Sequence, residues 1–187
     1  MPELVCTLTP VGQYRRIPVF PDIGDQQACA YGAGLQPERS LHVNIGTAGL
    51  FGAVCRAFDT DGFESRPWLE ESYYLRTASG LLGGRQVAAA RATLGCDDEQ
   101  TWQIMTTEPP AHFLRLYEEI AGQYYEKSVA MQLNVTSLHY SGGCALKNPA
   151  LRACIEKRFR LPLNAAVANN DIWKGMQAIA QTIQKHR

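Results

Sequence analysis

The order of strand-like and helix-like patterns limits the fold of this chain more than its composition does. Three early runs hold the β-branched, aromatic and apolar residues typical of β-strands, and they cover residues 41–46, 50–55 and 73–77. The stretch DTDGFESRP, between the second and third runs, is rich in turn-forming residues. We therefore expect consecutive strands that pair as an antiparallel meander.

The remainder of the chain alternates helices with strands. Apolar residues recur at helical spacing in residues 85–94 and again in residues 111–133. Further patterns predict a strand at 137–140, a helix at 149–159, a strand at 161–167 and a helix at 171–185 that begins with an Asn/Asp cap. A unit of strand, turn and helix comes before all of these, at residues 17–34. The sum is a β-β-β-α-β-α-β-α order, which predicts an α/β fold with a mixed sheet and helices on its faces.

Length, charge and cysteine usage exclude several classes of protein. The 187 residues suit one domain, predicted to span residues 1–187. Lys plus Arg number 18 and Asp plus Glu number 18, so no field of one sign attracts nucleic acid or an acidic membrane surface. No leader pattern and no apolar run of roughly 18 residues is present, which predicts a cytoplasmic protein. The six cysteines form no C-x-x-C pair, so we expect reduced thiols and no metal site of cysteines.

Asp25 is the first candidate for chemistry, because it follows a glycine after a predicted strand and opens an Ala-rich helix. Ligands of α/β sheets bind at such strand ends. A carboxylate there can accept a hydroxyl proton while the oxygen attacks a phosphoryl group, and Gln26 or Gln27 can hold neighbouring hydroxyls. The alternative interpretation is that Asp25 only caps its helix.

Three glycine-containing turns are the other candidates, at residues 44–49, 80–84 and 141–149. Glycine lets backbone N–H groups approach phosphate oxygens, and the hydroxyl of Thr47 adds a donor. The bare turn after residue 141 could carry a flat nucleobase, with Asn148 near its edge. No Walker A spacing occurs in the chain. Taken alone, each turn is better explained as an ordinary connection between elements.

Four segments, in order and mostly at matching spacing, resemble the C-terminal domain of the FGGY carbohydrate kinases. They are GDQQACAYGAG at 24–34, NIGTAG at 44–49, ASGLLGG at 78–84 and SGGCALKNPALRACIEKRFRLPL at 141–163. The stretch YYLRTASGLLGG is most similar to the sedoheptulokinase-like branch. The resemblance implies a ribonuclease-H-like (actin-like ATPase) domain that takes part in phosphorylating a sugar hydroxyl with ATP and Mg²⁺.

The same resemblance implies roles for individual residues. Asp25 matches the general base that takes the proton of the sugar hydroxyl, and Gln26 matches a sugar contact. The residues that match ATP-binding positions are Gly46, Thr47, Gly83, Gly84, Gly142, Gly143, Cys144 and Asn148.

The chain also departs from the family. The family's N-terminal domain, with its D-x-G-S/T phosphate loop and most of its sugar contacts, has no counterpart in this sequence, and the interval from Gly84 to Ser141 is short for the family. We therefore expect the chain alone to be inactive, and its partners to be a sugar substrate and an N-terminal kinase domain or a subunit that supplies it. A homodimer is the alternative arrangement.

Two different classes of function compete with the kinase. One is a non-catalytic kinase relic or interaction subunit, and the other is a thiol enzyme with Cys144 as nucleophile and His139 or His42 as base.

Overall fold

A six-stranded mixed sheet organises the protein, whose computed structural model describes residues 8–58, 62–95, 98–165 and 171–185. The strand order is β5-β6-β4-β3-β7-β8. The strands are β3 Ser40–Ile45, β4 Gly49–Cys55, β5 Glu64–Pro67, β6 Tyr74–Leu81, β7 Ser137–Ser141 and β8 Leu163–Ala165. The first four in sequence pair antiparallel, and β3, β7 and β8 run parallel. The predicted meander and mixed sheet are confirmed.

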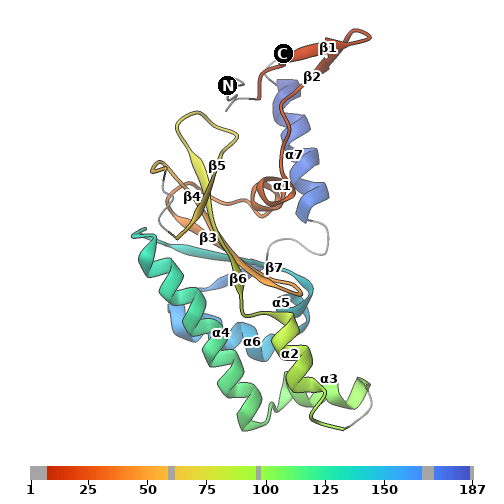
Figure 1. Cartoon of the computed structure of the whole chain (residues 1–187), viewed down its shortest axis with the longest axis vertical. Helices are drawn as coiled ribbons and strands as arrows, with labels where there is room; N and C mark the ends of the chain where they lie inside the picture. Colours follow the sequence, from red (N-terminus) through yellow and green to blue (C-terminus); the bar gives the residue numbers. More distant parts are fainter. Residues whose placement is uncertain (1–7, 59–61, 96–97, 166–170, 186–187) are drawn as a thin grey trace.

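Helices cover both faces of this sheet (Figure 1). They are α1 Asp25–Gly32, α2 Gly84–Arg91, α3 Asp98–Thr107, α4 Ala111–Ala130, α5 Gly143–Lys147, α6 Pro149–Phe159 and α7 Asp171–Lys185. Helices α1 and α7 pack against each other on one side, and α4 and α6 pack together on the other. Among the described residues, no helix combines the length and the apolarity that crossing a lipid bilayer requires.

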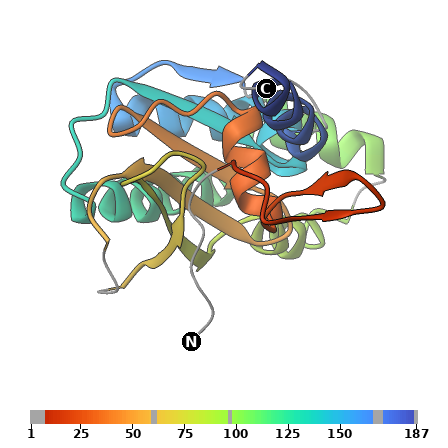
Figure 2. The ribbon, with the colours of Figure 1, turned by 90° about the horizontal axis from the view of Figure 1, so that it is seen from above.

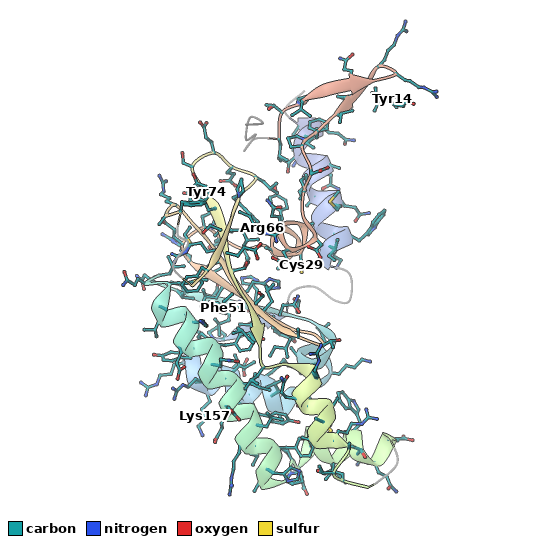
Figure 3. All side chains as sticks on the ribbon, viewed as in Figure 1. Tyr14, Cys29, Phe51, Arg66, Tyr74 and Lys157 are labelled. Carbon is teal, nitrogen blue, oxygen red and sulfur yellow. The ribbon has the colours of Figure 1, made fainter. Side chains whose placement is uncertain are left out.

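The larger core lies between the sheet and the α4–α6 layer. Alternate residues of β3, which are Leu41, Val43 and Ile45, are fully buried there. Phe51 of β4 meets the ring of Tyr124 from α4 edge to face, with ring centroids 6.2 Å apart. Figure 3 shows Phe51 in the middle of this layer. Each such side chain stabilises the fold by about 1.5–3 kcal/mol on burial.

The opposite layer is thinner and depends on small residues. Its core holds Ala30, Val54, Trp68 and Leu75 beneath α1. Gly175 of α7 lies directly against the backbone of Ala28 in α1, where any Cβ atom would overlap the Ala28 carbonyl. The two helices are therefore in backbone contact, and Figures 1 and 2 both show them side by side.

Strands β1 Gly12–Tyr14 and β2 Ile17–Val19 form a separate hairpin. The predicted strand at residues 17–20 is thus confirmed as β2, with β1 as an unpredicted partner. Arg15 and Arg16 at its tip both have positive φ, 49° and 66°, as a two-residue type I′ turn requires. The hairpin projects from the body of the protein beside α7 (Figures 1 and 2).

Several boundaries differ from the prediction. The segment expected to be only turn contains β5, and α3 was not predicted at all. Strand β6 continues four residues beyond residue 77, to Leu81. Strand β8 confirms part of the strand predicted at 161–167, whose last two residues lie outside the described residues. The Asn/Asp cap predicted at the start of the last helix includes residues 169 and 170, which are also outside them.

Candidate functional site

The three glycine turns predicted from the sequence meet in space at the ends of β3, β6 and β7. The amide of Gly84 donates to the carbonyl of Gly46 at 2.8 Å, and the amide of Arg85 donates to the carbonyl of Thr47 at 2.9 Å. Gly142, at φ +88°, lies against the carbonyl of Ile45 without room for a Cβ atom. Segments almost 100 residues apart in the chain are thus held as one surface.

An open depression of about 510 Å³ lies where these turns meet. It is lined by Gly46, Thr47, Gly84, Arg85, Ala88, Gly143 and Cys144. This volume is within the range of small-molecule sites. The structure therefore brings together five of the predicted ATP-binding residues and adds Arg85 and Ala88, which the sequence did not single out. Arg85 is exposed and forms no salt bridge within the described part of the chain.

The glycines of this surface serve two different purposes. A Cβ atom on Gly84 would lie 2.5 Å from the carbonyl oxygen of Gly46, and one on Gly83 would lie 2.8 Å from the amide nitrogen of Gly49. These glycines let the turns pack. A Cβ atom on Gly143, in contrast, would meet nothing within 4 Å. The packing of the protein does not require a glycine there, so Gly143 leaves space for a ligand.

Two alanine substitutions are expected to distinguish a glycine that the packing of the turns requires from a glycine that leaves space for a ligand. Gly84→Ala should lower stability by about 1–3 kcal/mol, because the new methyl group overlaps the backbone of the neighbouring turn. Gly143→Ala should leave the urea-unfolding midpoint nearly unchanged and weaken the binding of a ligand that lies on this backbone. Urea unfolding followed by circular dichroism checks both variants. Equal losses of stability would contradict this division of the glycines.

Asn148 lies on the third turn but is fully buried. Its Oδ1 accepts a hydrogen bond from the amide of Leu151 at 3.0 Å, which caps α6, and its Nδ2 donates to the hydroxyl of Tyr117 at 2.8 Å. Both ends of the amide are therefore used within the protein. A direct contact between Asn148 and a nucleobase stays a prediction.

The thiol of Cys144 is poorly suited to nucleophilic chemistry. Burial raises the pKa of this thiol to about 11, so it is protonated at neutral pH. No hydrogen bond joins it to a histidine within the described residues, and His42 is instead bonded to Ser141 through Nε2 at 2.8 Å. This geometry argues against the thiol-enzyme hypothesis.

Asp25 is the first residue of α1, and its side chain is exposed. The N-cap position belongs to Gly24, so the interpretation of Asp25 as the helix cap is wrong. The carboxylate accepts a hydrogen bond from the neighbouring amide of Gln26 at 2.7 Å. The Oε1 atom of Gln26 is buried and has no hydrogen-bond partner in the part of the chain that the structure describes. Neither residue lines the depression formed by the glycine turns.

Gln27 fixes the start of α1 to the sheet. Its Oε1 accepts from the amide of Gly24 at 2.8 Å, and its Nε2 donates to the carbonyl of Pro67 in β5. The side chain is thus occupied with bracing the turn that carries Asp25. Arg66 of β5 lies nearby, with Nη1 3.4 Å from the position of a Cβ atom on Gly24. Figure 3 shows Arg66 between β5 and α1.

A layer of buried polar side chains lies between α1 and strands β3 and β7. His42 is 2% exposed and stands beside His139 in the parallel register of the two strands. Ser141 links His42 to the sulfur of Cys29 in α1, at 2.8 and 4.0 Å. Figure 3 shows Cys29 between α1 and the sheet. Burial first, and then the charge of His139, lower the pKa of His42 to about 4.

Comparisons with known proteins identify the fold. No protein-family model and no curated protein matches the chain. Among solved structures, it is similar to a ligand-bound xylulose kinase from Lactobacillus acidophilus, with 14% identity, a TM-score of 0.77 and coverage of 92% of this chain and 44% of that one. A gluconate kinase from Lactobacillus acidophilus matches with 14% identity, a TM-score of 0.76 and the same coverages. The Plasmodium falciparum glycerol kinase with ADP matches with 16% identity, a TM-score of 0.70 and again 92% and 44% coverage.

The fold is therefore that of one actin-like ATPase domain of the FGGY sugar kinases, as predicted. The chain spans less than half the length of the kinases it matches.

Proposed function

We propose that this chain is the C-terminal half of an ATP-dependent sugar kinase, of the sedoheptulokinase-like branch, and that a second kinase domain completes its active site. One observation carries the proposal: three distant glycine turns form a single open depression with an exposed arginine, on the fold of a sugar-kinase domain. One of the structures with this fold is a glycerol kinase with ADP.

ATP would lie along the three turns. The backbone N–H groups of Gly46 and Thr47, which line the depression, would bind the phosphates, and Arg85 would supply a positive charge beside them. The turn that contains Gly143 and Cys144 carries the adenosine. Mg²⁺ would bridge the phosphates of ATP and neutralise their charge during the transfer.

Asp25 would act on the acceptor. As the sugar hydroxyl oxygen forms its bond to the γ-phosphorus and the bond from phosphorus to ADP breaks, the carboxylate takes the hydroxyl proton. Gln26 would contact the sugar. The exposure of Asp25 to solvent is a reason to expect a second wall, because transfer to a sugar instead of water requires a closed cleft.

ATP titration of the purified chain tests this proposal. We expect the wild-type chain to bind ATP, and Arg85→Gln to weaken the affinity about 10-fold or more, since a charge-assisted contact is lost. Arg115→Gln, on the exposed side of α4, is the matched control and should not change it. The chain alone should release no ADP with ribulose, xylulose, sedoheptulose or glycerol. Absence of ATP binding at millimolar concentration would refute the proposal, and robust turnover would refute the need for a second domain.

A non-catalytic interaction subunit is the second candidate. The observation in its favour is a set of exposed apolar side chains on the hairpin and α7. An interaction subunit would keep these contacts without binding ATP, so the same titration separates the two functions.

A further inference from the structure

Helix α4 contacts all three glycine turns through polar side chains. In chain order, the first turn is at residues 44–49, the second at 80–84 and the third at 141–149. The side chains that reach the turns are Tyr117, Gln123 and Tyr124. The two tyrosines are seven residues apart in sequence, so they lie on one face of α4, about two helical turns from each other.

Tyr124 joins the first turn to the second. Its hydroxyl donates to the carbonyl of Asn44 at 3.1 Å and lies 3.4 Å from the carbonyl of Leu82. Gln123 adds a contact to the same turn, because its Oε1 accepts from the amide of Leu82 at 2.7 Å. A Cβ atom on Gly49 would overlap the hydroxyl of Tyr124, so only a glycine at the end of the first turn admits this side chain. Helix α4 therefore holds together the two turns beside which the phosphates are proposed to lie.

Tyr117 holds the third turn. Its hydroxyl accepts a hydrogen bond from Nδ2 of Asn148 at 2.8 Å and donates to the carbonyl of Met105 in α3 at 3.2 Å. Asn148 directly follows α5, whose first two residues, Gly143 and Cys144, line the depression. The turn that is proposed to carry the adenosine is thus fixed by a different tyrosine from the one that joins the other two turns.

Both tyrosines are completely buried, so their hydroxyls act only inside the protein. Each side chain is 0% exposed, and burial raises the pKa of both hydroxyls, that of Tyr117 to about 12. The hydroxyls therefore keep their protons at neutral pH and can donate them to backbone carbonyls. A phenylalanine ring would fill nearly the same space, so the packing of the core requires neither hydroxyl.

We propose that Tyr117 and Tyr124 are positioning residues of the nucleotide site, and that each serves a different part of the ligand. Tyr124, together with Gln123, sets the spacing of the first and second turns for the phosphates, and Tyr117 sets the third turn for the adenosine. All three act through the turns, because none of them lines the depression itself. This inference rests on the proposed function and adds to it the residues that shape the site from beneath.

Titrations with ATP and with adenosine test this division of roles. Tyr124→Phe should weaken ATP binding about 5-fold or more and leave adenosine binding within about twofold of the wild type, because only the phosphate turns shift. Tyr117→Phe should weaken both ligands about 5-fold or more, since ATP and adenosine both use the third turn. Chemical-shift titrations measure these affinities up to millimolar ligand. Equal losses for both ligands in Tyr124→Phe, or no loss in either variant, would overturn the inference.

Two further variants complete the titrations. Gln123→Met removes the acceptor of the Leu82 amide at a half-buried position, which spares the core, and it should give the same selective loss of ATP as Tyr124→Phe. Ser128→Ala is the matched control, because Ser128 is a buried hydroxyl of the same helix whose hydrogen bond, to the carbonyl of Tyr125, stays within α4. It should change neither affinity, and a loss of ATP equal to that of Tyr124→Phe would contradict the proposed role of the turns.

Hydrogen exchange in the nucleotide-free chain tests the positioning directly. The amide of Gly84 reports on the contact between the first and second turns, and the amide of Leu146, which donates to the carbonyl of Gly142 at 3.0 Å, reports on the third. Tyr124→Phe should speed exchange about 5-fold or more at Gly84 but not at Leu146, and Tyr117→Phe should do the reverse. A loss of global stability would instead speed exchange at both amides together.

The two experiments distinguish a failure of this inference from a failure of the proposed function. Selective exchange in the two variants, on a wild-type chain that binds no ATP, would overturn the proposed function alone. ATP binding by the wild-type chain, with the same exchange rates at both amides in Tyr124→Phe as in the wild type or with an equal increase at both, would overturn this inference alone.

Discussion

Asp25→Asn is expected to lower kcat of the completed kinase by about 10²–10⁴-fold, the range of a lost general base. Asparagine cannot accept the proton of the attacking hydroxyl. It can still accept the hydrogen bond that the Gln26 amide donates to Asp25, and the helix cap is Gly24, which the substitution leaves intact. The melting temperature and the ATP affinity should therefore change little.

The measurement is kcat of the wild-type and substituted chains, each combined with the second kinase domain that is proposed to complete the active site. Asp22→Asn is the matched control, because Asp22 is an exposed carboxylate three residues earlier in the chain. The control should retain nearly full activity. A rate within threefold of the wild type for Asp25→Asn would exclude Asp25 as the base, and the residue roles implied by the family resemblance would lose their main support.

The elements that the sequence predicted well are those in which local preference and burial agree. Residues 41–46 contain the apolar Leu41 and the β-branched Val43 and Ile45 at alternate positions, and β3 is an interior strand that pairs with a neighbour on each side. The helix predicted at 149–159 matches α6 at both ends, because Asn148 caps it and Pro149 occupies its first position.

The missed elements are those that tertiary contacts impose. Strand β5 reads ESRP, a sequence with little strand preference, and it exists through its antiparallel pairing with β6 at the edge of the sheet. Helix α3 has no clear apolar stripe and packs against α6. Neither contact leaves a periodic pattern in the sequence.

The candidate site also combines features that the local sequence predicts with features that only tertiary contacts determine. Glycines after strand-like runs could be recognised as turns, and their convergence follows from strands that end at one edge of a sheet. Which glycine serves packing and which leaves space for a ligand depends on neighbours distant in sequence, as Gly84 and Gly143 show. Single cations such as Arg66 and Arg85 carry no spacing pattern, so the sequence alone could not single them out.

The polar layer beneath α1 should make the protein sensitive to acid. His42 is buried and neutral in the folded protein, with a pKa of about 4, while an unfolded histidine titrates near 6.5. Because the folded pKa is the lower one, the contribution of His42 to stability is fully present above about pH 6.5. It is lost as the pH falls from there through 4, since protonation then favours the unfolded chain. His139, whose pKa burial also lowers, acts in the same direction.

The expected loss from His42 is about 3 kcal/mol of unfolding free energy between pH 6.5 and pH 4. Urea unfolding at several pH values in this window measures it, and His42→Gln separates it from the titration of carboxylates. Glutamine can keep a hydrogen bond to Ser141 but cannot be protonated, so the variant should lose much less stability on acidification than the wild type. Parallel curves for the two proteins would mean that His42 does not control the acid response, and that the layer between α1 and the sheet accommodates a charged imidazole.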